Sequence, residues 1–156
     1  MLLKKFDISL EKNTKIIAEK LYEISRAGDA FALTGQLGTG KTSFARYFIQ
    51  KGCKGERVPS PSYNIYYQYQ CSKSSIIHLD AWRFVKEEEF LNLGISDFLK
   101  SSIFIVEWAN KIENYLPNNS LKIFFDIIEN RRFLSFFGEK SWKNRIKSIV
   151  DDKKII

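Results

Sequence analysis

The spacing of hydrophobic residues changes along the chain, from helical near the start to short continuous runs further on. Ile17, Leu21 and Ile24 recur at intervals that place them on one face of a helix. Residues 103–106 are uninterrupted apolar positions, which is typical of a strand buried on both faces. The pattern predicts helices over residues 14–26, 42–50 and 87–91 and one capped by Ser141, and strands over residues 29–34, 63–69, 75–80, 103–106, 121–128 and 133–137.

Strands and helices alternate in the first half of the chain, whereas strands gather in the second half. This order favours an α/β fold of three layers around a mixed, mostly parallel central sheet. The length of 156 residues, 44% of them hydrophobic, fits one domain over residues 1–156 with a substantial core.

The composition bears on the cellular compartment in which we expect this protein. No stretch approaches the roughly 18 uninterrupted apolar residues of a membrane span, so we expect no contact with a membrane. The first residues lack the apolar core of a signal peptide. Cys53 and Cys71 lie too far apart for a CxxC site, which favours reduced thiols and a cytoplasmic protein.

The formal net charge of +7 favours contact with an anionic molecule, such as nucleic acid or an acidic protein surface. Lys140, Lys143 and Lys147 fall on one face of the last predicted helix and are candidates for such a contact. A solvated lysine-rich surface is the more common explanation of a pattern like this, and it stays open here.

The strongest chemical signal is the segment over residues 35–42, which fits the pattern G-x-x-x-x-G-K-[ST]. A chance match in a chain of this length has odds of about one in two hundred. The segment also follows a predicted strand and opens a predicted helix. In such a loop, glycines let backbone N–H groups surround phosphate oxygens, the lysine (Lys41) reaches the β- and γ-phosphates, and the hydroxyl of Thr42 binds magnesium. The sequence therefore predicts a P-loop NTPase-like domain that binds ATP, or a close relative, with Mg²⁺.

Two acidic residues stand at the ends of predicted strands. Asp80 ends the strand over residues 75–80, and Glu107 follows the apolar run over residues 103–106. The carboxyl ends of parallel strands form the usual ligand edge of an open sheet, so both acids are candidates for the metal site. His78 lies two residues before Asp80, on the same face of its strand. It is either a general base or, with more weight, a hydrogen-bonded structural histidine.

The segment Asn110-Lys111-Ile112-Glu113 is similar to the guanine-reading motif N-K-x-D. The last residue is a glutamate, and two residues separate the motif from its strand. These departures do not favour GTP.

Four short motifs occur in one order along the chain. They are G-Q-L-G-T-G-K-T at 35–42, S-P-S-Y at 60–63, H-L-D-A-W-R at 78–83 and V-E-W at 106–108. Together they resemble the TsaE family (also called YjeE), bacterial P-loop ATPases needed to form threonylcarbamoyladenosine (t6A) in tRNA. The resemblance extends from about Thr14 to Phe136.

The resemblance implies a function and partners. A TsaE-like protein binds ATP and Mg²⁺, hydrolyses ATP and acts with TsaB and TsaD, of which TsaD carries the transferase chemistry on tRNA. It supports repeated turnover of that complex, reaches tRNA indirectly through it, and has no small-molecule acceptor. Its hydrolysis is expected to be weak without the partner proteins.

The resemblance also implies site residues. Lys41, Asp80 and Glu107 are the implied catalytic residues, with Thr42 and Glu107 as magnesium ligands and Asp80 near the metal or the attacking water. The implied nucleotide-binding residues are Thr14 near the base, Leu37, Gly38, Thr39, Gly40, Lys41, Thr42 and Ser43 around the phosphates, and Arg131 late in the chain.

Three positions depart from the family patterns. Ser62 replaces a threonine in a loop that resembles a nucleotide-sensing switch, and it keeps the hydroxyl. Trp82 replaces a tyrosine and keeps the ring. Either Arg131 or its neighbour Arg132 matches the late arginine of the family.

Two other functions remain open from the sequence alone. One is a P-loop kinase acting on a small molecule, which would need an arginine-bearing lid that the sequence does not show. The other is a binding module that ATP gates and in which hydrolysis is incidental.

Overall fold

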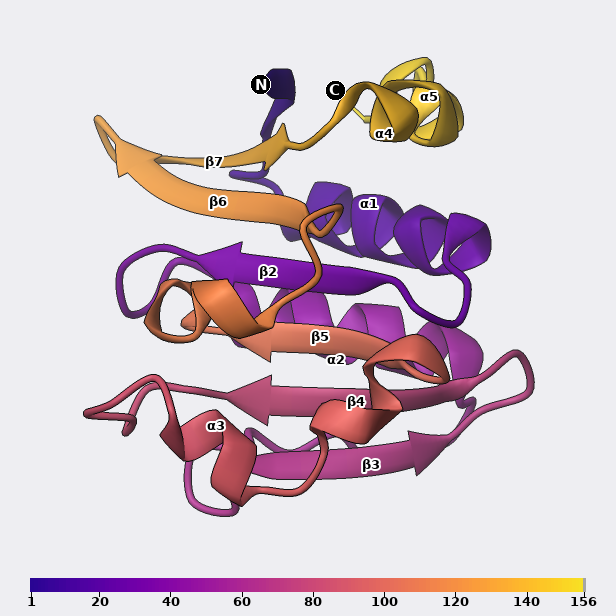
Figure 1. Ribbon diagram of the computed structural model, residues 1–156. Coiled ribbons are helices and arrows are strands. Elements are labelled where there is room, and N and C mark those ends of the chain that lie inside the picture. Colours follow the sequence, from indigo (N-terminus) through magenta and orange to yellow (C-terminus); the bar gives the residue numbers. More distant parts are fainter. Residues whose placement is uncertain (156) are drawn as a thin grey trace.

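The computed structural model describes residues 1–155 and contains one seven-stranded sheet in the order β1-β7-β6-β2-β5-β4-β3 (Figure 1). The central strands β6, β2, β5 and β4 run parallel to one another, whereas β7 and β3 flank them in the antiparallel direction and β1 pairs antiparallel with β7. The strands are β1 Leu2–Asp7, β2 Ala30–Thr34, β3 Tyr66–Gln70, β4 Ser75–Asp80, β5 Ile103–Glu107, β6 Leu121–Ile128 and β7 Arg131–Phe137. The expected mixed, mostly parallel sheet is confirmed.

Helices cover both faces of this sheet and make three layers. The helices are α1 Glu11–Ile24, α2 Lys41–Gly52, α3 Glu89–Asn92, α4 Lys140–Arg145 and α5 Lys147–Val150. Figure 1 shows α1 and α2 behind the sheet and α3 in front of it. The larger hydrophobic core lies on the side of α1 and α2, and a smaller core lies between the sheet and α3. Within residues 1–155, the structure has no helix with the length and apolar character that crossing a membrane requires.

The alternation of side chains across β2 shows how one strand serves both cores. Phe31 and Leu33 point into the core with α1 and α2, and Phe31 packs edge-on against Trp142 of α4. Ala30 and Ala32 point to the opposite face. The two alanines are buried there in the smaller core.

The last helices are held to the sheet mainly by apolar contacts. Trp142, Ile146 and Ile149 are buried. Arg145 forms an ion pair with Asp29 and lies over the Trp142 ring. Its role is therefore structural, while the lysines of this segment are exposed.

Several element boundaries differ from the prediction. The strand expected from residue 63 begins only at Tyr66, because the preceding residues form a turn and Ile65 has a φ of 69°. Ser141 does not cap the last helix: α4 begins at Lys140, and the residue before it, Glu139, makes no capping bond through its side chain. β1 was not predicted, because Phe6 is its one buried residue and Lys4 and Lys5 are exposed.

The expectation of two separate reduced thiols is wrong for this structure. Cys53 follows α2 and Cys71 follows β3, and the two residues form a disulfide bond with their Cα atoms 5.0 Å apart. They are 18 positions apart in sequence, so their proximity depends on how α2 packs against the edge of the sheet.

Candidate functional site

The loop between β2 and α2 is shaped by glycines that no other residue would replace without strain. Gly35 has a φ of 143°, and a Cβ atom there would come 2.4 Å from the carbonyl oxygen of Phe125. Gly40, the residue before α2, has a φ of 110° in the left-handed region. The backbone therefore turns sharply and points the unpaired N–H groups at the start of α2 toward one side, which is the geometry that binds phosphate.

Lys41 is almost completely buried at the first position of α2. Its Nζ donates hydrogen bonds to the carbonyl oxygens of Gly35 and Gln36, each at 2.7 Å, and lies 4.3 Å from the centre of the Trp108 ring. Burial lowers the pKa of Lys41, and the carboxylates of Glu107 and Asp80 raise it part of the way back. The ammonium group thus sits in a site of low dielectric, where its attraction for a phosphate is strong.

Glu107 joins the loop to the sheet. It ends β5, is 2% exposed, and accepts a hydrogen bond from the Thr42 hydroxyl at 2.5 Å through Oε1. Its other oxygen, Oε2, lies 2.7 Å from Nε2 of His78 on β4. The structure thereby brings together the two residues, Thr42 and Glu107, that the sequence assigned to the metal.

Asp80 ends β4 and pairs with Glu107 in the parallel register of β4 and β5. Its Oδ2 accepts a hydrogen bond from the Ser62 hydroxyl at 2.9 Å, and its Oδ1 accepts one from the Trp82 backbone N–H at 2.8 Å. The hydroxyls of Ser62 and Ser60 are 2.8 Å apart. The serine loop (residues 60–62) is therefore hydrogen-bonded to Asp80, the second acid of the site.

A cavity of about 600 Å³ opens above these groups. Nine residues singled out from the sequence line it: Leu37, Gly38, Gly40, Lys41, Thr42, Ser43, Ser62, Asp80 and Glu107. Tyr63 and Arg83, to which sequence reasoning gave no role, line it as well, as does Arg132, one of the two candidates for the late arginine of the family. Tyr63 and Arg83 each close one of the short motifs, at residues 60–63 and 78–83, and this is the signal that could have found them.

Three residues expected around the nucleotide lie outside the lining of this cavity. Thr39 is buried beneath the loop, and its hydroxyl donates to the carbonyl oxygen of Gln36. Thr14 is buried within α1. Arg131 forms an ion pair with Asp7 of β1. Their expected roles at the nucleotide remain predictions.

The choice between Arg131 and Arg132 follows from the alternation of side chains along β7. Leu134 and Phe136 belong to the core with α1 and α2, and Arg132 has the same parity along the strand. It therefore faces the layer that contains the start of α2, and it lines the cavity. Of the two arginines, Arg132 is the one that the structure places beside the loop.

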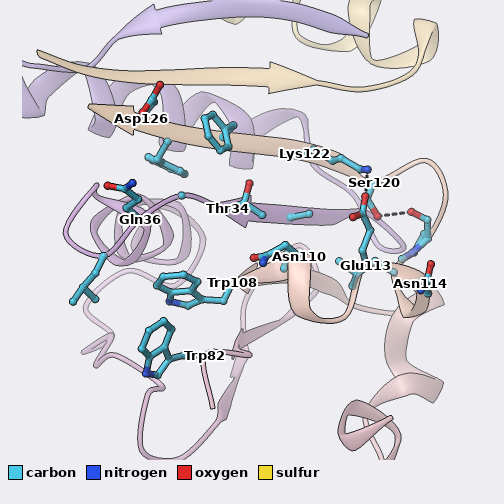
Figure 2. Close-up of a pocket in the computed structure, with 18 of the residues that line it drawn as sticks. Thr34, Gln36, Trp82, Trp108, Asn110, Glu113, Asn114, Ser120, Lys122 and Asp126 are labelled. Carbon is cyan, nitrogen blue, oxygen red and sulfur yellow. Dashed lines mark hydrogen bonds and ion pairs between the residues drawn. The ribbon is translucent and has the colours of Figure 1, made fainter. Parts of the chain in front are cut away.

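A second cavity of about 970 Å³ adjoins the first and shares Leu37, Trp82 and Trp108 with it. Figure 2 shows Trp82 and Trp108 side by side at one end of it and Glu113 and Lys122 at the other. The two tryptophan rings have centroids 4.4 Å apart and line both cavities. Trp108 has a φ of 57°, a strained conformation for a bulky residue, and its side chain borders both spaces.

The residues similar to a guanine-reading motif lie beside this second cavity and have other contacts. Lys111 donates hydrogen bonds to the carbonyl oxygens of Trp82 and Phe84. Glu113 forms an ion pair with Lys122. These contacts support the structure of the segment and do not favour a base-reading role.

The donor set of the first cavity fits magnesium. Within residues 1–155 no cluster of three or more His, Cys, Asp or Glu side chains forms an all-protein metal cage. Mg²⁺ does not need one, because it is usually held by one or two protein oxygens together with water and substrate phosphates. The hydroxyl of Thr42 and the carboxylate of Glu107 are such a pair.

The chain has a glycine loop between the buried strand β2 and the helix α2, and acids at the ends of the adjacent strands β4 and β5. These features define an α/β protein with a P-loop-like fold. The family described as "Threonylcarbamoyl adenosine biosynthesis protein TsaE" matches residues 8–133. The chain belongs to the TsaE family.

Individual relatives agree with this assignment. A "tRNA threonylcarbamoyladenosine biosynthesis protein TsaE" from Rickettsia felis is 30% identical over 133 residues, which are 84% of this chain and 78% of that protein. The protein of the same name from Bacillus subtilis is 33% identical over 113 residues, 72% of this chain and 70% of that protein. The crystal structure of YdiB from Bacillus subtilis superposes with a TM-score of 0.80 at 23% identity and covers 96% of both chains, which supports the fold. Neither alternative from the sequence, the small-molecule kinase or the gated binding module, is favoured by these relatives.

Proposed function

We propose that this chain is a Mg²⁺-dependent ATPase that acts with TsaB and TsaD in the formation of t6A on tRNA. The observation that carries the proposal is the contact between the Thr42 hydroxyl and the Glu107 carboxylate at 2.5 Å, at the start of the helix that follows the glycine loop. Membership of the TsaE family connects this site to tRNA modification.

The phosphates of ATP fit the cradle formed by the loop and α2. Backbone N–H groups at the start of α2 donate to phosphate oxygens, and Lys41 neutralises charge on the β- and γ-phosphates. Thr42 and Glu107 would hold Mg²⁺, which would offset the negative charge of the phosphates. Arg132 lines the same cavity and adds a second positive group.

Asp80 is suited to orient the attacking water. Both of its oxygens already accept a hydrogen bond, so the position of the carboxylate is fixed by Ser62 and by the backbone of Trp82. A carboxylate oxygen has a second lone pair that can accept a proton from water. Movement of the serine loop would therefore change the orientation of Asp80 directly.

The surface around the cavity supports a protein partner. Leu37 and Tyr63 line the cavity and are 80% and 84% exposed, and Trp82, which lines it too, is 47% exposed. Exposed apolar side chains gathered around a binding site are typical of a protein–protein interface. We assign this surface to the TsaB–TsaD complex, through which the chain reaches tRNA in the cytoplasm without a small-molecule acceptor of its own. Residues 1–156 act as one domain.

Replacing Asp80 with asparagine tests the proposed hydrolysis. We expect phosphate release in the presence of TsaB and TsaD to fall about 100-fold, because the asparagine amide is a weaker acceptor for the proton of water. The affinity for ATP should change less than about threefold, since the loop and Lys41 are intact. The measurement is steady-state phosphate release together with ATP titration. Unchanged phosphate release would exclude Asp80 from the reaction.

A further inference from the structure

The only histidine of the chain, His78, lies inside the sheet. It is completely buried in β4 and pairs in register with Ile105 of β5, two residues before Asp80 and Glu107 pair in the same ladder. It does not line the cavity beside the glycine loop. This position excludes direct contact with a nucleotide or an attacking water, so the general-base role considered from the sequence does not fit the structure.

The contact of His78 with Glu107 is specific. Nε2 lies 2.7 Å from Oε2, while the opposite oxygen of the same carboxylate, Oε1, accepts the hydrogen bond of Thr42. Glu107 is thus held at both oxygens, by one side chain of the sheet and one of the glycine-loop helix. A carboxylate held at two points cannot rotate about its terminal bond without losing one of these hydrogen bonds.

The partners of the imidazole indicate which nitrogen carries the proton. Nδ1 has no hydrogen-bond partner among residues 1–155. Nε2 faces a carboxylate oxygen, which accepts a hydrogen bond, so Nε2 must donate one. The hydrogen on Nε2 therefore points at Oε2 and fixes the side of Glu107 that faces away from Thr42.

We infer that His78 is a positioning residue for the metal-binding carboxylate Glu107. The inference rests on the proposed function, in which Thr42 and Glu107 hold Mg²⁺. Groups that hydrogen-bond to a metal ligand orient it and tune its affinity, and their removal typically lowers metal affinity tenfold or more. His78 occupies this place: it fixes Oε2 and leaves Oε1 directed at Thr42 and the loop.

The test compares variants that keep or remove the donor at the Nε2 position. Glutamine places an amide N–H near the position of Nε2, whereas asparagine is too short to reach Oε2 and leucine has no donor. The probe is a fluorescent ATP analogue, titrated in Mg²⁺ and in EDTA. For His78→Leu and His78→Asn we expect the gain in affinity that Mg²⁺ gives to shrink about tenfold, with affinity in EDTA unchanged. His78→Gln should retain the gain within about twofold.

A purely structural role for His78 predicts a different result. It would lower thermal stability in all three variants and leave the effect of Mg²⁺ on affinity intact. The matched control is Ile76→Val, which trims a buried side chain on the same face of β4. It should alter thermal stability alone. The asparagine variant keeps the comparison valid if the leucine variant does not fold.

The outcomes separate this inference from the function on which it rests. If wild-type protein binds the ATP analogue equally well in Mg²⁺ and in EDTA, both the metal site and the role of His78 are wrong. If wild-type protein responds to Mg²⁺ and the His78→Leu and His78→Asn variants respond equally, only the role of His78 is wrong. A His78→Gln variant as impaired as His78→Asn would also overturn the inference.

Discussion

Replacing Lys41 with alanine should raise the Kd for ATP about 100-fold, equivalent to about 3 kcal/mol. Lys41 is nearly buried at the start of α2, close to Glu107 and Asp80. Removing its charge leaves the phosphates facing two carboxylates with less positive charge to offset them, so hydrolysis should fall further, by about 1,000-fold. Isothermal titration with ATP and Mg²⁺ measures the first effect, and phosphate release with TsaB and TsaD measures the second.

The control for this prediction is Lys143→Ala, which removes an equal charge from the exposed face of α4. It should leave affinity and hydrolysis unchanged within about twofold. Because the carbonyl oxygens of Gly35 and Gln36 lose a donor when Lys41 is replaced, thermal unfolding must show that the variant remains folded. A folded Lys41→Ala protein with unchanged ATP affinity would mean that the nucleotide does not bind at the glycine loop.

Glu107→Gln should separate metal binding from nucleotide binding. The amide keeps the size of the side chain but removes its charge, and an amide oxygen is a weaker ligand for Mg²⁺ than a carboxylate. Affinity for ATP in EDTA should stay the same or rise, because a negative group beside the phosphates is lost. The gain in affinity on adding Mg²⁺ should disappear, and hydrolysis with TsaB and TsaD should fall about 1,000-fold.

Glu113→Gln is a matched control, since it makes the same chemical change at an exposed carboxylate that pairs with Lys122 beside the second cavity. Titration of ATP against Mg²⁺ concentration is the direct measurement for both variants. A Glu107→Gln protein that responds to Mg²⁺ like the Glu113→Gln control would place the metal elsewhere.

The parts of the site that could be predicted from sequence are those that lie in one short segment. The glycine loop needs particular residues at adjacent positions, so its motif also predicted the strand before it and the helix after it. The strands over residues 75–80 and 121–128 were predicted with the bounds that the structure has, because apolar runs end there at charged or turn residues. The ends of two predicted strands then indicated the two acids, Asp80 and Glu107, that lie at the sheet edge.

Contacts between segments far apart in the sequence could not be predicted from local patterns. Ser62 and Asp80 are 18 positions apart, and the hydrogen bond between them depends on how the loop after α2 returns to the sheet. The same holds for Cys53 and Cys71, whose disulfide overturned the expectation of free thiols. Which of two adjacent arginines faces the loop depends on the register of β7, which a single sequence does not determine.

β1 illustrates a different limit. Its residues alternate poorly, and its pairing with β7 depends on backbone hydrogen bonds along the edge of the sheet together with the burial of Phe6 against Phe136. No local hydrophobic pattern marks such a strand, because only one of its six side chains is fully buried.

The most direct test of the proposed function is synthesis of t6A from purified components under conditions that require many turnovers. The mixture contains TsaB, TsaD, tRNA, ATP, Mg²⁺ and a supply of the threonylcarbamoyl donor, with wild-type chain, the Lys41→Ala variant or no addition. We predict that only the wild-type chain sustains synthesis beyond about one modified tRNA per TsaD. If the Lys41→Ala variant, or the mixture without the chain, sustains the same number of turnovers, ATP binding at the glycine loop is not what this protein contributes.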